Sequence, residues 1–205
     1  MGSHARLPTM NIALRTARMT RDQFFEWAER HEGRWEFDGF EPVAMTGDTI
    51  NHSQICGNLL VALRTRVQGK GCRPLGPDAG LATIGDTVRY PDALVTCSKV
   101  EGNARVVPGV VVVFEVLSPS NNRTDRIVKL REYRAVSSIR RYVIVEHASV
   151  DLTVYARSGA DEDWTATALT VEEILHMPEI GIEIPIAELY EDVDLSTDSG
   201  NPTSS

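Results

Sequence analysis

The sequence feature that most constrains this fold is an acidic residue inside an otherwise apolar run. Glu115 lies in the segment Val-Val-Val-Val-Phe-Glu-Val-Leu, residues 110–117, which is bounded by Pro-Gly and Ser-Pro pairs. Apolar, mostly β-branched residues between such turn signals predict a strand that is buried on both faces of a sheet. Burying a carboxylate there costs on the order of several kcal/mol unless a cation or hydrogen-bond donors meet it. The chain therefore either pairs Glu115 with a buried base or uses it in a site.

The composition predicts a single globular domain located in the cytoplasm. With 205 residues, 42% of them apolar, the chain can bury a sizeable core. No apolar run approaches the roughly 20 residues needed to cross a membrane, and no signal peptide is visible. Three cysteines without CxxC spacing argue against a zinc site and for reduced thiols. The net charge of −8 argues against general attraction to nucleic acid, although residues 123–141 are locally basic.

The domain is expected over residues 19–192. Residues 1–18 are interpreted as a tag remnant with an N-terminal extension, and residues 193–205 as a disordered tail rich in Ser, Thr, Asp, Gly and Pro. A capping box from Thr20 to Gln23 begins a first helix, and apolar periodicity predicts a second at about 51–68. A third helix is expected at about 123–136, after a turn at Ser118-Pro119-Ser120 in which Ser120 caps the helix.

Strands are predicted between and after these helices. The expected segments are 34–37, 42–45, 81–84, 88–97, 110–117, 141–146, 151–157 and 164–170, with 69–80 as a loop and 171–175 as one or two helical turns. This order of elements favours an α/β chain of the α+β kind, with a mixed β-sheet flanked by helices on both faces.

A second carboxylate, that of Asp92, is expected near Glu115. Asp92 follows Pro91 in the apolar segment before residues 110–117, and strands joined by a short loop are usually neighbours. Two carboxylates about 4 Å apart repel by roughly 4 kcal/mol at an effective dielectric constant of 20. A divalent cation removes this repulsion, and hard oxygen ligands suit Mg²⁺ or Mn²⁺.

The chain resembles the PD-(D/E)XK nuclease superfamily, and within it the bacterial "putative restriction endonuclease" family called Uma-two. The resemblance covers about residues 19–192. It is carried by Arg34-Trp-Glu-Phe-Asp-Gly39, His52, Pro91-Asp92, Glu115-Val-Leu-Ser-Pro-Ser120, Asp125, Lys129, Tyr133 and Arg141-Tyr-Val-Ile-Val145. It implies a restriction-endonuclease-like fold and a metal-dependent phosphodiesterase site.

The resemblance also implies roles for individual residues. Asp92 would be the central metal ligand and Glu115 the second, with the carbonyl of Val116 nearby, while Glu36 matches an acid that often completes such sites. Leu117 stands where the motif has its lysine. Lys129 is the expected replacement, since it lies one helical turn from both Asp125 and Tyr133 on one helix face.

Each of these residues also has a purely structural interpretation. Glu115 could form a buried ion pair with Arg141 or Lys129, and Asp92, after Pro91, could be only a turn or strand-edge residue. Glu36 could be an exposed strand charge, and His52 a histidine satisfied near a helix start. Lys129 could pair only with Asp125, and Tyr133 could be a core aromatic residue.

The predicted function is Mg²⁺- or Mn²⁺-dependent hydrolysis of DNA phosphodiester bonds, with Lys129 stabilising the transition state. The alternative is a catalytically inactive nuclease-fold protein that acts as a nucleic-acid or protein-interaction module. Cutting both strands of duplex DNA needs two sites, which favours a homodimer by analogy with other two-fold proteins.

Overall fold

A computed structural model of the chain describes residues 18–117 and 123–197, with the side chains of 123–125 and 197 excepted. Within this part, the largest sheet has six strands in the order β10-β9-β8-β7-β6-β3. Its central pair, β7 (Val110–Val116) and β8 (Arg141–Val145), is parallel, and the other pairs are antiparallel. The remaining strands are β3 (Arg73–Leu75), β6 (Ala93–Thr96), β9 (Asp151–Ala156) and β10 (Thr165–Thr170). The predicted mixed sheet is therefore confirmed.

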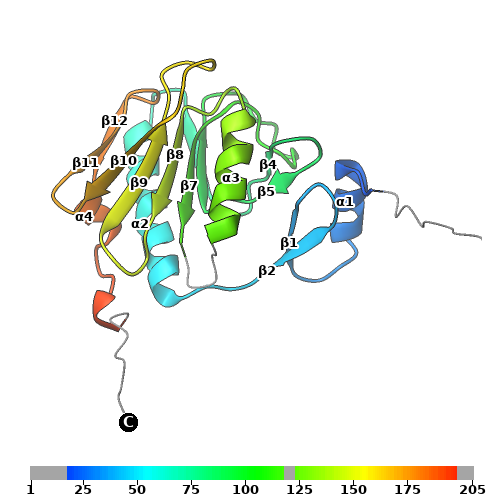
Figure 1. Cartoon of the computed structure of the whole chain (residues 1–205), viewed down its shortest axis with the longest axis horizontal. Coiled ribbons are helices and arrows are strands. Elements are labelled where there is room, and N and C mark those ends of the chain that lie inside the picture. The colour runs from blue at the N-terminus through cyan, green and yellow to red at the C-terminus, as the bar shows by residue number, and fades with distance from the viewer. Residues whose placement is uncertain (1–17, 118–122, 198–205) are drawn as a thin grey trace, which may run out of the picture.

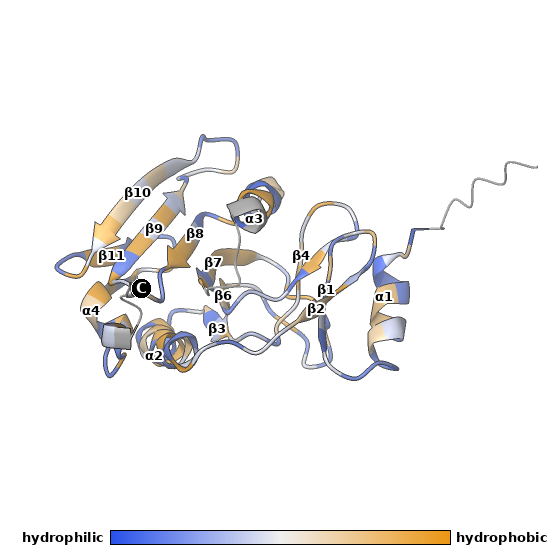
Figure 2. Ribbon diagram, turned by 60° about the horizontal axis from the view of Figure 1, so that its bottom comes forward, coloured by the Kyte–Doolittle hydropathy of each residue, from blue (hydrophilic) through white to orange (hydrophobic). Residues whose placement is uncertain are grey.

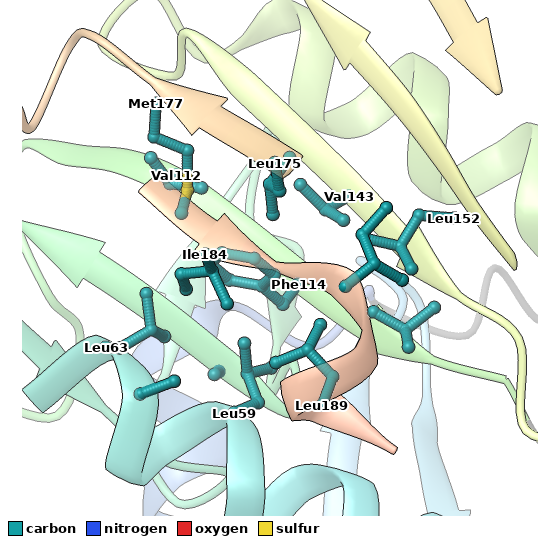
Figure 3. Packing of buried hydrophobic residues seen from close by; sticks show 14 of the residues in the cluster. Leu59, Leu63, Val112, Phe114, Val143, Leu152, Leu175, Met177, Ile184 and Leu189 are labelled. Atoms are coloured by element: carbon teal, nitrogen blue, oxygen red, sulfur yellow. The ribbon is translucent and has the colours of Figure 1, made fainter. Parts of the chain in front are cut away.

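Two helices cover opposite faces of this sheet (Figures 1 and 2). Helix α3 (Arg123–Ala135) is the crossover that the parallel β7–β8 pair requires. Helix α2 (Ile50–Val67) packs on the other face, where Leu59 and Leu63 meet Phe114 (Figure 3). The same core includes residues of β11 (Ile174–Met177), β12 (Ile182–Pro185) and α4 (Ile186–Leu189); a short 3₁₀ helix, Leu195–Thr197, follows.

A smaller unit stands beside the main sheet (Figure 1). In the described residues it is a four-stranded sheet, β2-β1-β5-β4, covered by α1 (Arg21–Ala28), with the strands β1 (Arg34–Phe37), β2 (Pro42–Met45), β4 (Leu81–Ala82) and β5 (Val88–Arg89). The capping box at Thr20 is present, as predicted. Phe24 of α1 stacks on Phe37 of β1 with the ring centroids 5.1 Å apart, and this contact packs the helix against the β1–β2 pair.

Three predicted elements are wrong in detail. The expected strand 88–97 is two short strands, β5 and β6, separated by the segment 90–92. Pro91 has no N–H to donate to a ladder, so the chain bends there instead of continuing the strand. The helical turns expected at 171–175 are a turn that leads into β11, and β3 lies inside the segment expected to be a loop.

The prediction of reduced thiols is also wrong for two of the cysteines. Cys72 and Cys97 form a disulfide with a Cα–Cα distance of 3.9 Å. Cys72 stands just before Arg73 and Cys97 just after Thr96, and these two neighbours form an antiparallel pair, so the β3–β6 pairing places the cysteines opposite each other. Their separation of 25 residues gives no local signal of this contact. Cys56 is the free cysteine of the described part.

Candidate functional site

Glu115 faces α3 because of its position in β7. Side chains alternate between the two faces of a strand. Phe114 and Val116 lie in the core beneath α2, whereas Val113 and Leu117 lie in the core beneath α3. Glu115 therefore points toward α3, with only 4% of its surface exposed.

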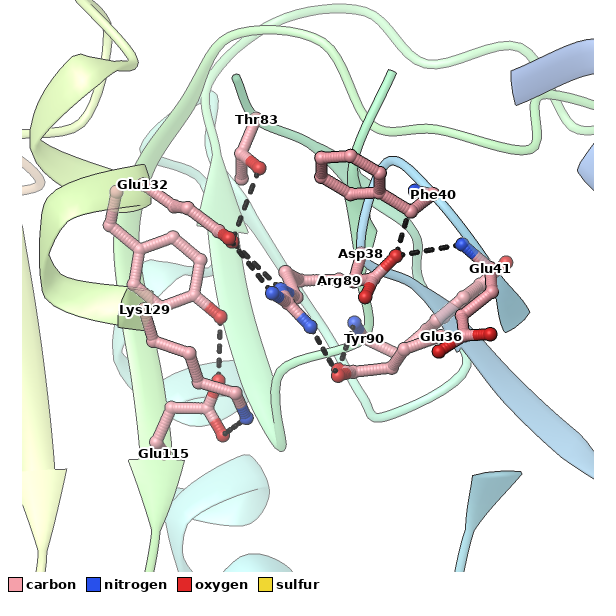
Figure 4. A network of polar contacts seen from close by, with 11 residues as sticks. Glu36, Asp38, Phe40, Glu41, Thr83, Arg89, Tyr90, Glu115, Lys129 and Glu132 are labelled. Atoms are coloured by element: carbon pink, nitrogen blue, oxygen red, sulfur yellow. Dashed lines mark hydrogen bonds and ion pairs between the residues drawn. The ribbon is translucent and has the colours of Figure 1, made fainter. Parts of the chain in front are cut away.

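Helix α3 supplies two partners to this buried carboxylate. The ammonium Nζ of Lys129 lies 3.1 Å from Glu115 Oε2 (Figure 4). The hydroxyl of Tyr133, one turn further along, donates to Glu115 Oε1 at 2.6 Å. Lys129 and Arg141 were both considered as partners of Glu115. In the structure Glu115 pairs with Lys129, whereas Arg141 pairs with Glu179.

The charge state of Glu115 is set by competing effects. Burial is the largest influence and raises the pKa of Glu115, whereas the charge of Lys129 lowers it. The charges of Asp92 and Glu36 raise it, the Tyr133 hydrogen bond lowers it, and the balance takes the pKa from 4.5 to about 7. The influence of Asp92 means that the two carboxylates interact electrostatically. Glu115 is thus poised to change its proton occupancy near neutral pH.

Asp92 lies at the end of β6 that is paired with this part of β7. The pair Ala93–Phe114 brings the preceding residue, Asp92, beside Glu115 and Val116. The Asp92 carboxylate accepts the Val116 N–H at 2.7 Å through Oδ2. Val116 thus meets Asp92 through its N–H, and its backbone also forms a hydrogen bond with His52. A metal-binding role for its carbonyl stays a prediction.

His52 reaches Asp92 from the start of α2. The helix begins after Thr49, whose side chain accepts the His52 N–H at 3.2 Å. The ring Nε2 of His52 lies 3.4 Å from Asp92 Oδ1 and 3.8 Å from Asp48 Oδ2. Burial lowers the pKa of His52, but the hydrogen bond and charge of Asp92, together with Asp48, outweigh it, so the pKa is raised. His52 is therefore both close to a helix cap and in contact with a predicted metal ligand.

Glu36 lies in a neighbouring network with Arg89 and Tyr90 (Figure 4). Its carboxylate accepts the Tyr90 N–H at 3.0 Å and pairs with Arg89 at 3.1 Å. Arg89 also binds Glu132 of α3 through two hydrogen bonds of 2.7 and 2.8 Å. Glu36 is 7% exposed, so it is not an exposed strand charge, and its charge still raises the pKa of Glu115.

The sequence interpretation missed three residues around the site. Arg89 and Glu132 are buried and connect the smaller unit, the sheet β2-β1-β5-β4 with α1, to α3. A charged residue between Val88 and Tyr90, in an apolar segment, was a signal for Arg89. Cys56 stands one turn after His52, with its Sγ 3.7 Å from His52 Nδ1, and this i,i+4 spacing could have drawn attention to it.

One predicted site residue and one predicted turn fall outside the described part of the chain. Asp125 belongs to α3, but its side chain is not among those described. The turn at Ser118-Pro119-Ser120, in which Ser120 was expected to cap the helix, lies in the undescribed segment 118–122.

The arrangement of the main sheet and its helices defines a nuclease-like fold. A crystal structure of "a putative nuclease belonging to DUF820 from Anabaena variabilis" matches this chain with a TM-score of 0.66. The match covers 84% of this chain and 97% of that one at 16% sequence identity, which shows a shared fold. Among the described residues, no helix is both long and apolar enough to span a bilayer.

Sequence comparison then identifies the family. The model of the Uma2 family, described as "Putative restriction endonuclease", matches residues 21–187. The chain belongs to this family, as its motifs predicted. "Uncharacterized protein slr1290" of Synechocystis sp. is 26% identical over 176 residues, covering 84% of this chain and 92% of the relative. "Uncharacterized protein sll1609" of the same organism is 22% identical over 167 residues, with coverages of 80% and 94%.

Proposed function

We propose that this chain is a metal-dependent endonuclease that hydrolyses phosphodiester bonds of DNA at a site built from Asp92, Glu115 and Lys129. The observation that carries the proposal is the contact between Lys129 and Glu115, which are 3.1 Å apart. It lies beside the end of β7 where the Asp92 carboxylate accepts the Val116 N–H. Family membership supports a nuclease-like activity, since the family is described as "Putative restriction endonuclease".

The donor set fits Mg²⁺ or Mn²⁺. Asp92 and Glu115 offer carboxylate oxygens, the ligand type that these cations prefer. The charge of Asp92 contributes to the raised pKa of Glu115, and a divalent cation between them would relieve this repulsion. When bound, such an ion supplies an activated water and polarises the phosphate.

The protein's own groups have distinct tasks in this proposal. Asp92 is held by the Val116 N–H and His52, so its carboxylate is fixed at the end of β6. Tyr133 holds Glu115 by a hydrogen bond of 2.6 Å to Oε1, whereas Lys129 contacts Oε2. Lys129 places a positive charge beside Glu115, where it would stabilise charge that develops on the phosphate. Glu36 acts through Arg89 and Glu132 to hold α3 in position.

The same contacts are compatible with the inactive alternative. A buried Glu115–Lys129 ion pair satisfies both charges without any metal. The two functions differ in metal binding, because a purely structural pair needs no cation. A calorimetric titration with Mn²⁺ is therefore the decisive measurement, with cleavage of supercoiled plasmid in Mg²⁺, Mn²⁺ or chelator as its companion.

We expect wild-type protein to bind Mn²⁺ and to cut plasmid only with added metal, and Asp92→Ala to lose both properties. Asp78→Ala is the matched control, because the Asp78 side chain is 91% exposed and pairs with Arg34 at the surface. A wild-type protein that binds no Mn²⁺ would support the inactive module instead.

For duplex DNA we further propose that two copies act together, since each strand needs a site. Analytical ultracentrifugation at micromolar concentration, with and without a DNA duplex, tests this. A species that remains monomeric and only nicks its substrate contradicts it.

A further inference from the structure

A second group of metal-ligand side chains adjoins the proposed site, between the start of α2 and the segment that precedes β6. His52, Cys56 and Asp92 each offer one ligand atom, and these atoms all lie within 4.8 Å of one another. Cys56 Sγ lies 3.7 Å from His52 Nδ1, and Asp92 Oδ1 lies 3.4 Å from His52 Nε2. All three residues are partly buried, so the cluster is close to solvent without being on the open surface.

The spacing along α2 is suited to metal binding. Residues 52 and 56 are four apart in an α-helix, which places both side chains on one face. The same i,i+4 separation presents two histidines to zinc in metalloprotease helices. The segment that precedes β6 then brings a carboxylate to the same point from another element.

The distances are close to those of a tetrahedral site. Zinc–sulfur bonds of about 2.3 Å and zinc–nitrogen or zinc–oxygen bonds of about 2.0–2.2 Å place tetrahedral ligand atoms roughly 3.3–3.6 Å apart. The thiol and carboxylate contacts engage different ring nitrogens, so the imidazole must shift to present one nitrogen to the ion. From separations of at most 4.8 Å, closure needs about 1 Å of side-chain movement.

We propose that His52, Cys56 and Asp92 form a site for a thiophilic divalent ion of the Zn²⁺ type, and that this ion competes with Mg²⁺ or Mn²⁺ for Asp92. A thiolate and an imidazole favour Zn²⁺ over Mg²⁺, which prefers oxygen ligands only. Asp48, 3.8 Å from His52, stands at the rim as a further oxygen donor. The competition rests on the proposed function, whereas binding of Zn²⁺ does not.

Binding changes the protonation of two groups in this proposal. His52 must be neutral to offer a ring nitrogen, so any proton that its raised pKa retains is released to the buffer. The Cys56 thiol loses its proton to the buffer as the sulfur–metal bond forms, and neither protein nor metal changes oxidation state. Zn²⁺ would then act as an inhibitor, because Asp92 cannot serve both ions in full. The nuclease site would thus respond to the supply of thiophilic metal.

A titration of the full chain with Co²⁺, a spectroscopic substitute for Zn²⁺, tests the site directly. The protein is kept free of reductant so that Cys72 and Cys97 stay in their disulfide. A thiolate-to-cobalt absorption band then reports on Cys56, the remaining cysteine. We expect this band to saturate at one ion per chain and to be displaced by Zn²⁺.

Variants assign the ligands. Cys56→Ser should abolish the band and weaken Zn²⁺ binding by roughly tenfold or more, and His52→Gln should weaken it similarly. Circular dichroism verifies that the variants are folded, and Cys56→Ala provides a second substitution at that position. His176→Ala is the matched control: His176 is an exposed histidine paired with Glu183 at 2.9 Å, a surface pair that could bind Zn²⁺ weakly.

The outcomes separate this inference from the proposed function. Absence of the thiolate band, or Zn²⁺ binding that Cys56→Ser leaves unchanged and His176→Ala abolishes, overturns the inference. Lys129→Met should retain the band, because Lys129 is not a ligand. If the protein shows the band but binds no Mn²⁺ at Asp92 and never cleaves DNA, the Zn²⁺ site stands and the proposed nuclease function is refuted. Protein that cleaves DNA, with no effect of Zn²⁺ on Mn²⁺ binding, refutes the competition.

Discussion

Lys129 Nζ lies 3.1 Å from Glu115 Oε2, although the lysine belongs to α3 and the glutamate to β7. Both side chains are nearly inaccessible, at 9% and 4% exposure for the residues. The contact places a lysine beside the acidic residue of β7. In β7 itself, the position where the nuclease motif has its lysine is 117, and a buried leucine occupies it. A cation supplied by the crossover helix thus stands where the strand supplies none.

Replacing this lysine should separate binding from cleavage. Lys129→Met keeps the length of the side chain and removes its charge, so we expect Mn²⁺ binding to persist and plasmid cleavage to fall about a hundredfold, as for loss of one transition-state donor. Lys99→Met is the control, because Lys99 is exposed and pairs with Glu101 at the surface. Cleavage at the wild-type rate by Lys129→Met would leave the lysine with a structural role only.

Metal-free stability should depend on pH through Glu115. Between pH 4.5 and about 7 the folded protein holds a proton on Glu115 that the unfolded chain has released, since burial raises the pKa of this group. Raising the pH through this window therefore lowers the free energy of unfolding. Thermal unfolding in chelator should show this loss in wild type and a smaller one in Glu115→Gln. Glu101→Gln, at an exposed carboxylate, should follow wild type; an identical pH dependence in Glu115→Gln would contradict the assignment.

The buried Arg89 should be essential for holding the smaller, four-stranded unit against α3. Arg89→Met leaves the Glu36 and Glu132 carboxylates without their shared cation, so we expect a loss of about 3–5 kcal/mol in denaturant unfolding. Arg34→Met, which removes an exposed ion pair with Asp78, should cost about 1 kcal/mol or less. If the network holds α3 in place, the triple variant Glu36→Gln, Arg89→Met, Glu132→Gln should be less unstable than Arg89→Met alone. Equal stabilities of Arg89→Met and Arg34→Met would rule out this role.

The Cys72–Cys97 disulfide should stabilise the edge of the main sheet. It joins residues 25 apart in sequence, and closing a loop of this size contributes typically about 2–4 kcal/mol. A reductant should therefore lower the unfolding midpoint of wild type and leave Cys72→Ser/Cys97→Ser unaffected. Cys56→Ser should respond to the reductant as wild type does. A midpoint that is insensitive to reductant in wild type would mean that the disulfide contributes little.

The sequence alone determined the local elements and the most unusual residue. Turn signals around residues 110–117 and their β-branched composition predicted the buried strand, and Glu115 was conspicuous because a lone carboxylate there needs a partner. The capping box at Thr20 predicted the start of α1, apolar periodicity predicted α2, and the turn after residue 117 predicted that α3 follows. Such patterns act over a few residues, so neighbours in the chain are enough to reveal them.

Only the tertiary structure decided which distant residues meet. The pairing of β3 with β6 joins Cys72 to Cys97, and the pairing of β6 with β7 brings Asp92 to the Val116 N–H. The packing of α3 on the sheet gives Arg89 its contact with Glu132. Periodicity assigns a side chain to one face of its element, but strand order and helix packing determine what lies opposite that face. For this reason the sequence indicated Glu115 and Lys129 as candidates, whereas their contact depended on the fold.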